Sequence, residues 1–176
     1  LADNGLDPAP YVKQMEYVFR VALDKRSTNT KNSLVERLAL IAAIEHLTAF
    51  LGMWVLTEKG LDEADVDPRM LDLVRWHGAE EVEHRAVAYD VLQYFDTRRF
   101  RRTRTYLLVA PTVVVMWGRG LRFLMKNDPT LTDDQRSYTL KQIRAVTQRG
   151  LFPTAKAVGK ASVRYLRKDY HPSKEG

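Results

Sequence analysis

The chain has 176 residues, 45% of them hydrophobic, and contains no cysteine. This size suits one domain with a buried core, while the missing cysteines exclude disulfides, thiolate metal sites and cysteine nucleophiles. Residues 1–97 carry 10 basic and 17 acidic side chains, whereas residues 98–176 carry 18 and 5, which gives a net charge of +6. The basic second half predicts attraction to acidic lipid, nucleic acid or an acidic partner, or else attraction between the two halves.

The first expected helix covers residues 9–25, where apolar side chains recur at helical spacing. The segment before it begins with Leu1 rather than methionine and lacks the basic and apolar regions of a signal peptide. We interpret this start as that of a fragment or a processed chain, and we expect a cytoplasmic protein.

The second expected helix covers residues 31–59 and carries a carboxylate, Glu45, within an apolar stripe. The stripe consists of Leu34, Leu38, Ile41, Ala42, Ala49, Gly52 and Leu56. A buried carboxylate is costly unless it is paired or bound to a metal, and the small residues beside Glu45 leave room for a cavity. His46 lies about 100° further around the helix and is expected to flank the stripe.

The third expected helix covers residues 68–95, after an Asp67–Pro68 start signal. On a helical wheel Glu81 and His84 lie within about 40° of His77. Their stripe also contains Met70, Leu73, Val74, Ala88, Val91, Leu92 and Phe95. We therefore expect these polar groups to be sunk into a core, with Glu80 at the edge of the stripe and Glu83 on the opposite, solvent-exposed side.

The Glu81-x-x-His84 spacing lets a carboxylate and an imidazole converge on one ion. Four-helix metal proteins with bridging carboxylates use one Glu from each of two helices and a Glu-x-x-His motif from each of the other two. Glu45, Glu81 and His84 make half of that set. The alternative is a metal-free bundle in which the two glutamates pair with Arg37, Arg75 or the histidines.

A basic cluster at residues 98–104 precedes the apolar run from Tyr106 to Trp117. This run is shorter than the roughly 20 residues of a spanning helix, and Pro111 interrupts it. It suits either a peripheral membrane segment over Arg98 to Trp117 or a buried core helix of the bundle. The sequence does not favour nucleic acid as a partner, because aromatic residues are sparse among the basic ones and no recognition motif is present.

The rest of the chain predicts two further basic helices and an irregular tail. The helices are expected at residues 132–149, where Thr132 and Gln135 have capping-box spacing, and at residues 153–168, before the tail at 169–176. No strand-like alternation, repeat or long linker interrupts the pattern. The sequence therefore predicts one all-α domain over residues 1–176.

Three stretches of the chain, AAIEHLTAFLG, WHGAEEVEHRAVAYDV and the segment near YHP, carry a family resemblance. Their matching positions are Ala42, Glu45, His46, Thr48, Ala49, Trp76, His77, Glu80, Glu81, Glu83, His84, Tyr89, Asp90, Tyr165, Tyr170, His171 and Pro172. In these positions the chain resembles a bacterial family of predicted metal-dependent hydrolases with a ferritin-like helical fold. The resemblance implies a metal-dependent enzyme built on a ferritin-like helical bundle.

Members of this family are usually longer, with an upstream Gly-Glu helix and a Gln-Glu-x-x-His helix that would supply the other half of the ligand set. The present chain begins about where that region would end. We expect either that an N-terminal segment is missing or that a second chain completes the site as a homodimer, and we favour the first.

We expect a separate role for each polar residue of these motifs. Glu45, Glu81 and His84 are expected to hold a two-metal site of iron, manganese or zinc, and His77 and Glu80 to orient the ligands or move protons. Asp90 is expected to orient a ligand or pair helices, and His171 to pack near the chain end. The chemistry remains open between hydrolysis and dioxygen activation at di-iron, on a small-molecule or lipid-like substrate, and a metal-free binding or peripheral membrane module is the rival class.

Overall fold

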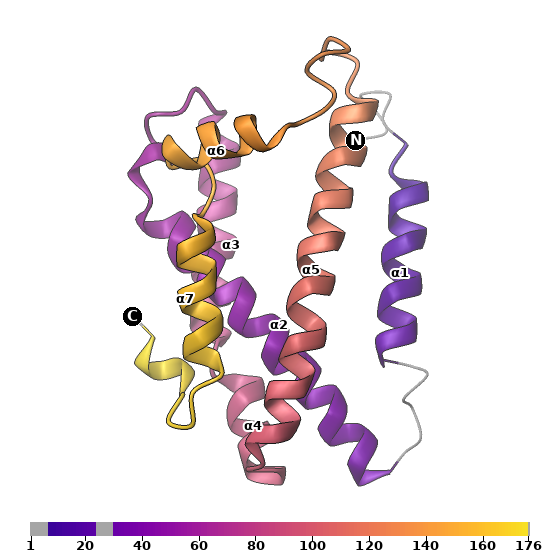
Figure 1. The fold of residues 1–176 in the computed structure, drawn as a ribbon, viewed down its shortest axis with the longest axis vertical. Helices are drawn as coiled ribbons and strands as arrows, with labels where there is room; N and C mark the ends of the chain where they lie inside the picture. Colours follow the sequence, from indigo (N-terminus) through magenta and orange to yellow (C-terminus); the bar gives the residue numbers. More distant parts are fainter. Residues whose placement is uncertain (1–6, 24–29, 176) are drawn as a thin grey trace.

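The computed structural model describes residues 7–23 and 30–175, and this part of the chain is helical without a strand. The elements in chain order are α1 (Ala9–Leu23), α2 (Lys31–Thr57), η2 (Lys59–Leu61), α3 (Pro68–His84), α4 (Val87–Phe95), α5 (Arg99–Asn127), α6 (Leu140–Gln148), α7 (Ala155–Tyr165) and η3 (Pro172–Lys174). Figure 1 shows their arrangement, and the all-α prediction is confirmed. Residues 24 and 25, which the prediction assigned to the first helix, and the chain start at Leu1 lie outside the described residues.

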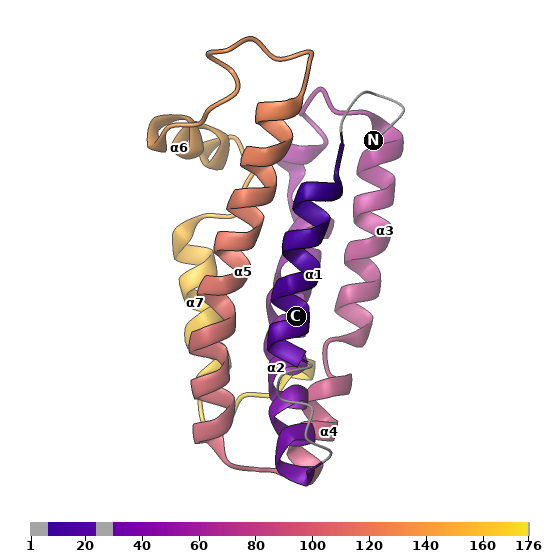
Figure 2. The same ribbon diagram turned by 90° about the vertical axis from the view of Figure 1, so that its right-hand side faces the viewer.

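Helix α2 is the central element of the fold. It packs against α3, α4 and α5 and makes fewer contacts with α7. Helix α1 contacts α5. Figure 2 shows α5 and α7 on one side of α2 and α3 on the other. Alanines at 39, 42 and 43 are buried on α2, and the absence of large side chains there lets the neighbouring helices approach closely.

The crossing of α2 and α3 depends on a glycine pair. A Cβ atom added to Gly52 would lie 2.4 Å from the carbonyl oxygen of Gly78, and one added to Gly78 would lie 3.1 Å from the Cα of Gly52. Only residues without a side chain permit this backbone contact. The contact holds the part of α2 around Glu45 beside the part of α3 that carries His77 and Glu81.

The single helix predicted over residues 68–95 is wrong, because it breaks at Arg85 and Ala86 into α3 and α4. No proline or glycine marks the break. Ala86 supplies no side-chain cap to α4, and instead Glu45 on α2 accepts a hydrogen bond of 3.1 Å from the backbone N–H of Ala88. Tertiary contact thus stabilises the start of α4, and the residues from Ala88 to Phe95 do not continue the stripe of α3.

The helix predicted over residues 132–149 begins only at Leu140. Thr132 does receive its expected partner, since its backbone N–H donates to Gln135 Oε1 at 3.0 Å, but no helix follows. The same Thr-x-x-Gln spacing recurs at Thr139 and Gln142, where both bonds of a capping box are present. The final helix is also shorter than the predicted 153–168, and the tail contains the short η3.

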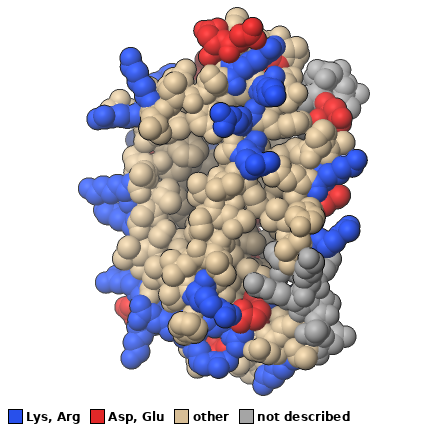
Figure 3. Space-filling view, turned by 45° about the vertical axis from the view of Figure 1, so that its right-hand side comes forward, with Lys and Arg blue, Asp and Glu red and all other residues tan. Residues whose placement is uncertain are grey.

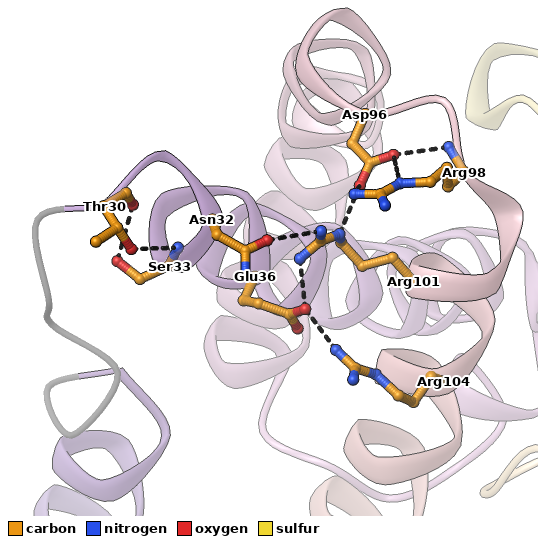
Figure 4. Close-up of polar contacts among 8 residues, drawn as sticks. All are labelled: Thr30, Asn32, Ser33, Glu36, Asp96, Arg98, Arg101 and Arg104. Atoms are coloured by element: carbon orange, nitrogen blue, oxygen red, sulfur yellow. Dashed lines mark hydrogen bonds and ion pairs between the residues drawn. The ribbon is translucent and has the colours of Figure 1, made fainter.

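Two of the five arginines at residues 98–104, Arg101 and Arg102, are buried in the fold. Arg101 is buried and binds Asp96, Glu36 and Asn32, as Figure 4 shows. Arg104 also pairs with Glu36, which lies on α2. At this point the acidic first half and the basic second half attract each other within the fold. The Asp96 carboxyl group has a pKa well below its ordinary value because Arg98 and Arg101 donate hydrogen bonds to it.

Candidate metal centre

Five polar residues singled out in the sequence lie on one side of the α2–α3 pair. Glu45 comes from α2, and His77, Glu80, Glu81 and His84 come from the second half of α3. The helical spacing of four and seven residues places the α3 groups on neighbouring turns. The glycine contact between the two helices then brings Glu45 toward them.

The Glu45 carboxyl group is the most perturbed member of this set. Its pKa is raised, first because partial burial disfavours the charged form, and further by the negative charge of Glu81. The hydrogen bond from the Ala88 N–H and the nearby His84 act in the opposite direction. A half-buried carboxylate that faces a second carboxylate is stabilised by a proton or a cation between them.

His77 lies over the acidic residues of its own helix. Its Nε2 atom is 3.5 Å from Glu81 Oε1, and its Nδ1 atom is 3.9 Å from Glu80 Oε2. The His77 side chain is 65% exposed, whereas that of Glu81 is 25% exposed. His77 is therefore placed to hold Glu81 from the solvent side, as a group that orients a ligand would be.

The prediction that these groups are sunk into a core is wrong for the described part of the chain. Met70, Leu73 and Val74 on α3, and Leu34 and Ile41 on α2, are exposed, although the sequence places all five on the apolar stripes. His84 is exposed as well, and Glu83 is on the surface as expected. Other members of the α2 stripe, Ala42, Ala49 and Gly52, are buried, and Gly52 contacts Gly78 of α3, so each stripe is only partly open.

The side chains on this face are of the chemical types that bind metal ions, but too few of them lie close together. Carboxylate oxygens and an imidazole nitrogen are ligands that suit iron, manganese and zinc. Within residues 7–23 and 30–175, however, no group of three or more such side chains is gathered closely enough to hold a metal.

The metal-free alternative proposed arginine partners for the glutamates, and the structure assigns one of them elsewhere. Arg75 binds Asp62 through two hydrogen bonds of 2.7 and 2.9 Å. Of the groups considered as partners, His77 is within ion-pair distance of Glu81, and the Glu45 carboxylate caps α4. The glutamates thus have structural contacts of their own, but these contacts leave their carboxylates on an open face.

His46 was expected only to flank the stripe, but its side chain is buried and both of its ring nitrogens are hydrogen-bonded. Its Nδ1 atom is 2.8 Å from the Tyr170 hydroxyl and its Nε2 atom is 3.1 Å from the Ala161 carbonyl oxygen. Because a carbonyl can only accept, Nε2 carries the proton and Nδ1 accepts from Tyr170. Burial lowers the pKa of His46 to about 4, so the ring is neutral at physiological pH.

Aromatic rings and one arginine surround His46. The ring of Tyr165 lies 4.6 Å from that of His46, with Tyr170 at 5.3 Å, and Arg102 donates to the Tyr89 hydroxyl at 3.0 Å. The Tyr89 hydroxyl in turn donates to the Tyr170 carbonyl at 2.6 Å. The C-terminal tail is therefore tied to α2, α4 and α5 through one polar and aromatic cluster.

Asp90 and His171, the last two polar motif positions, bind each other. His171 Nε2 lies 2.9 Å from Asp90 Oδ1, and the His171 ring packs on Tyr89. His171 thus packs near the chain end as predicted, and Asp90 pairs α4 with the tail. The sequence signal for this cluster is that its members are positions of the family resemblance, but spacing along the chain does not show which distant elements meet.

The model of a protein family described as "Predicted metal-dependent hydrolase" matches residues 1–176 of the chain. No curated protein and no solved structure matches it. The residues quoted above for the resemblance fall within the matched range.

Proposed function

Because the chain belongs to the family of predicted metal-dependent hydrolases, we propose that Glu45, Glu81 and His84 are metal ligands of a hydrolytic enzyme. One observation carries the assignment to these residues. Helices α2 and α3 touch at Gly52 and Gly78, and Glu45 of α2 accepts a hydrogen bond from the Ala88 N–H just after α3, so Glu45 lies at the end of α3 that carries Glu81 and His84. Carboxylate-bridged sites in ferritin-like bundles use this donor type in this arrangement.

The three donors form half of a two-metal site with iron, manganese or zinc. Two carboxylates and one imidazole leave room for an equal set from a facing helix pair, and the exposed apolar stripes of α2 and α3 are the surface on which such a pair would dock. The facing pair comes from a further segment of the protein or from a second copy in a homodimer. Either arrangement would complete a ferritin-like bundle and bury the stripes.

The roles of the chain's own residues follow from their positions. Glu45 Oε2 accepts a hydrogen bond from the Ala88 N–H, and Oε1 is the oxygen that we assign to the metal. His77 holds Glu81 from the solvent side and, with Glu80, provides groups that can carry a proton to or from the site. Metal ions in such sites supply Lewis acidity that activates water for hydrolysis. The substrate class is a small or lipid-like molecule.

The test compares matched substitutions in the protein expressed from its full gene. Glu81→Ala and His84→Ala are expected to abolish stoichiometric binding of iron, manganese or zinc, whereas Glu83→Ala, on the exposed opposite side of α3, should keep it. Metal content is measured by elemental analysis after dialysis against each ion. Equal metal content in all three variants would contradict the ligand assignment.

Two additional readouts on the same samples separate the rival chemistries and assemblies. A visible absorption band from a bridged di-iron centre would favour dioxygen activation, whereas a colourless zinc or manganese protein favours hydrolysis. The mass of the metal-loaded particle in solution distinguishes a site completed within one chain from a site shared by two. A protein without metal in every preparation would support the metal-free binding module.

A further inference from the structure

Helix α5 has two apolar faces with different surroundings. On the inner face Tyr106 and Val109 are buried against the bundle, at 2% and 6% exposure. On the outer face Leu107, Val114 and Val115 are each 59% exposed. The apolar run predicted as either a core helix or a membrane segment is therefore a core helix on one side only, and its other side is covered by no described element.

The exposed apolar residues of α5 extend along most of the helix. They are Phe100, Leu107, Leu108, Val114, Val115, Trp117, Leu121 and Leu124. Monomeric proteins rarely expose so long a contiguous apolar strip without a use for it. Trp117, with an apolar ring and one polar N–H, is a side chain suited to the boundary between lipid and water.

The charged side chains of α5 itself are all of one sign. The 29 residues of α5 include Arg99, Arg101, Arg102, Arg104, Arg119, Arg122 and Lys126 and no acidic residue. The five acidic residues after position 97 all lie in the loop at 128–134 or in the tail from 169 onward. Figure 3 shows that the middle of this side is uncharged, with more basic than acidic side chains around it and acidic groups mainly at its top and right edge.

The way α5 is anchored favours a helix that lies along a membrane over one that crosses it. By length and composition α5 and α2 could each span a bilayer, so the twelve-residue run underestimated the apolar length. However, Arg101 and Arg102 are buried on the inner face. Arg101 donates hydrogen bonds to Glu36 and Asp96, and Arg102 donates one to Tyr89. Transfer of α5 into a bilayer would break these contacts and place the arginines in hydrocarbon.

The exposed stripe on α3 provides a contrast within the same molecule. Its apolar residues are followed directly by Glu80, Glu81 and Glu83, and an anionic surface would repel them. Helix α5 lies on the other side of α2 (Figure 2) and carries only cations. The two apolar faces thus fit different partners.

We propose that the outer face of α5 is the surface on which this protein lies on membranes that contain anionic lipid. Leu107, Val114 and Val115 enter the boundary between headgroups and acyl chains, and Arg119, Arg122 and Lys126 bind lipid phosphates and carboxylates. The proposal does not depend on the metal site, because the two surfaces share no residue. It places the protein at a membrane as a peripheral, not a spanning, component.

The experiment measures co-sedimentation of the full protein with vesicles of phosphatidylcholine and phosphatidylserine, with pure phosphatidylcholine vesicles as the reference. Binding is expected only with the anionic lipid and should be lost at high salt, which screens the surface charges. Arg122→Gln combined with Lys126→Gln should weaken binding about 25-fold, since each cation near the membrane contributes a factor of about five. The matched control is Lys59→Gln with Arg69→Gln, which removes two exposed cations outside α5 and should leave binding unchanged.

The apolar contribution is tested by Leu107→Glu, for which binding should fall more than about tenfold. Leu140→Glu on α6 is the control, because Leu140 is also exposed but lies outside the strip. Circular dichroism shows whether each variant is folded. The proposal is overturned if the folded wild type fails to bind anionic vesicles at low salt, if test and control variants bind alike, or if the protein resists release by high salt as a spanning helix would. It also fails if Leu107→Glu only converts a dimer into a monomer without any lipid binding by the wild type.

Discussion

Glu45 and His46 are neighbours in the chain and face opposite environments. Glu45 points to an open face shared with α3, where its carboxylate caps α4 and lies near Glu81 and His84. His46 points to the other side of α2, where α5, α7 and the tail enclose it. One short motif therefore contains a group available for chemistry and a group that holds the fold together.

The difference arises from what covers each side of the helix. The rings of Tyr106, Tyr165 and Tyr170 surround His46 and remove it from water, so that it is stable only as the neutral ring. Glu45 keeps partial access to solvent and to cations. Adjacent motif residues thus need not share an environment, and under the proposed function burial separates the structural residue, His46, from the metal ligand, Glu45.

The largest expected effect on stability comes from His46→Ala. The substitution leaves the Tyr170 hydroxyl and the Ala161 carbonyl without their partner and opens a cavity among the aromatic rings. We expect the free energy of unfolding to fall by about 3–5 kcal/mol. Denaturant unfolding measures the change, with His77→Ala as control. Because the His77 side chain is exposed, its removal should cost less than about 0.5 kcal/mol, and similar losses for the two variants would contradict the comparison.

The pH dependence of stability follows from the same burial. The pKa of His46 is lowered to about 4 in the folded protein, whereas an unfolded chain has a histidine pKa near 6.5. Above that value the ring is neutral in both states. As the pH falls from about 6.5 to about 4, the unfolded chain gains a proton that the folded one does not, so stability decreases by about 3 kcal/mol. This loss should be absent from His46→Gln, and unfolding curves for both proteins across this window measure it. The same slope in both proteins would show that other groups cause it.

A moderate effect is expected at the crossing of α2 and α3. Gly52→Ala would place a Cβ atom against the backbone of Gly78 and should destabilise the protein by about 1–3 kcal/mol, because the helices must move apart. Gly159→Ala on α7 is the control, since nothing lies within 4 Å of its added Cβ, and it should stabilise by about 0.5–1 kcal/mol. Thermal unfolding of the pair measures both changes. A neutral Gly52→Ala would mean that the crossing does not need this contact.

Much of the fold could be predicted because local signals suffice for it. The apolar character of α2, the Asp67–Pro68 start of α3 and the basic residues of α5 are all encoded within a few turns of helix. The break at Arg85 could not be predicted, since the group that stabilises it, Glu45, lies 43 residues away from Ala88. The start of α6 was misplaced because two Thr-x-x-Gln sequences compete within eleven residues.

In the candidate site, too, the local relations could be predicted from the sequence and the long-range ones could not. Helical spacing correctly placed His77 beside Glu81 on one face, because that relation is local. Whether the face is covered depends on which elements meet, and spacing gives no information on that. For the same reason the sequence does not show the burial of His46 and Arg101, since all their partners except Asp96 lie 65 to 124 residues away in the chain.

The most direct test measures metal content and unfolding free energy together in Glu45→Gln and His46→Gln, with the protein expressed from its full gene. Glu45→Gln keeps an oxygen to accept from the Ala88 N–H but removes the charge, so it should lose metal while its stability changes by less than about 1 kcal/mol. His46→Gln should keep stoichiometric metal in the folded protein and lose stability. Full metal content in Glu45→Gln, or loss of metal in a folded His46→Gln, would contradict the division of roles between the two residues.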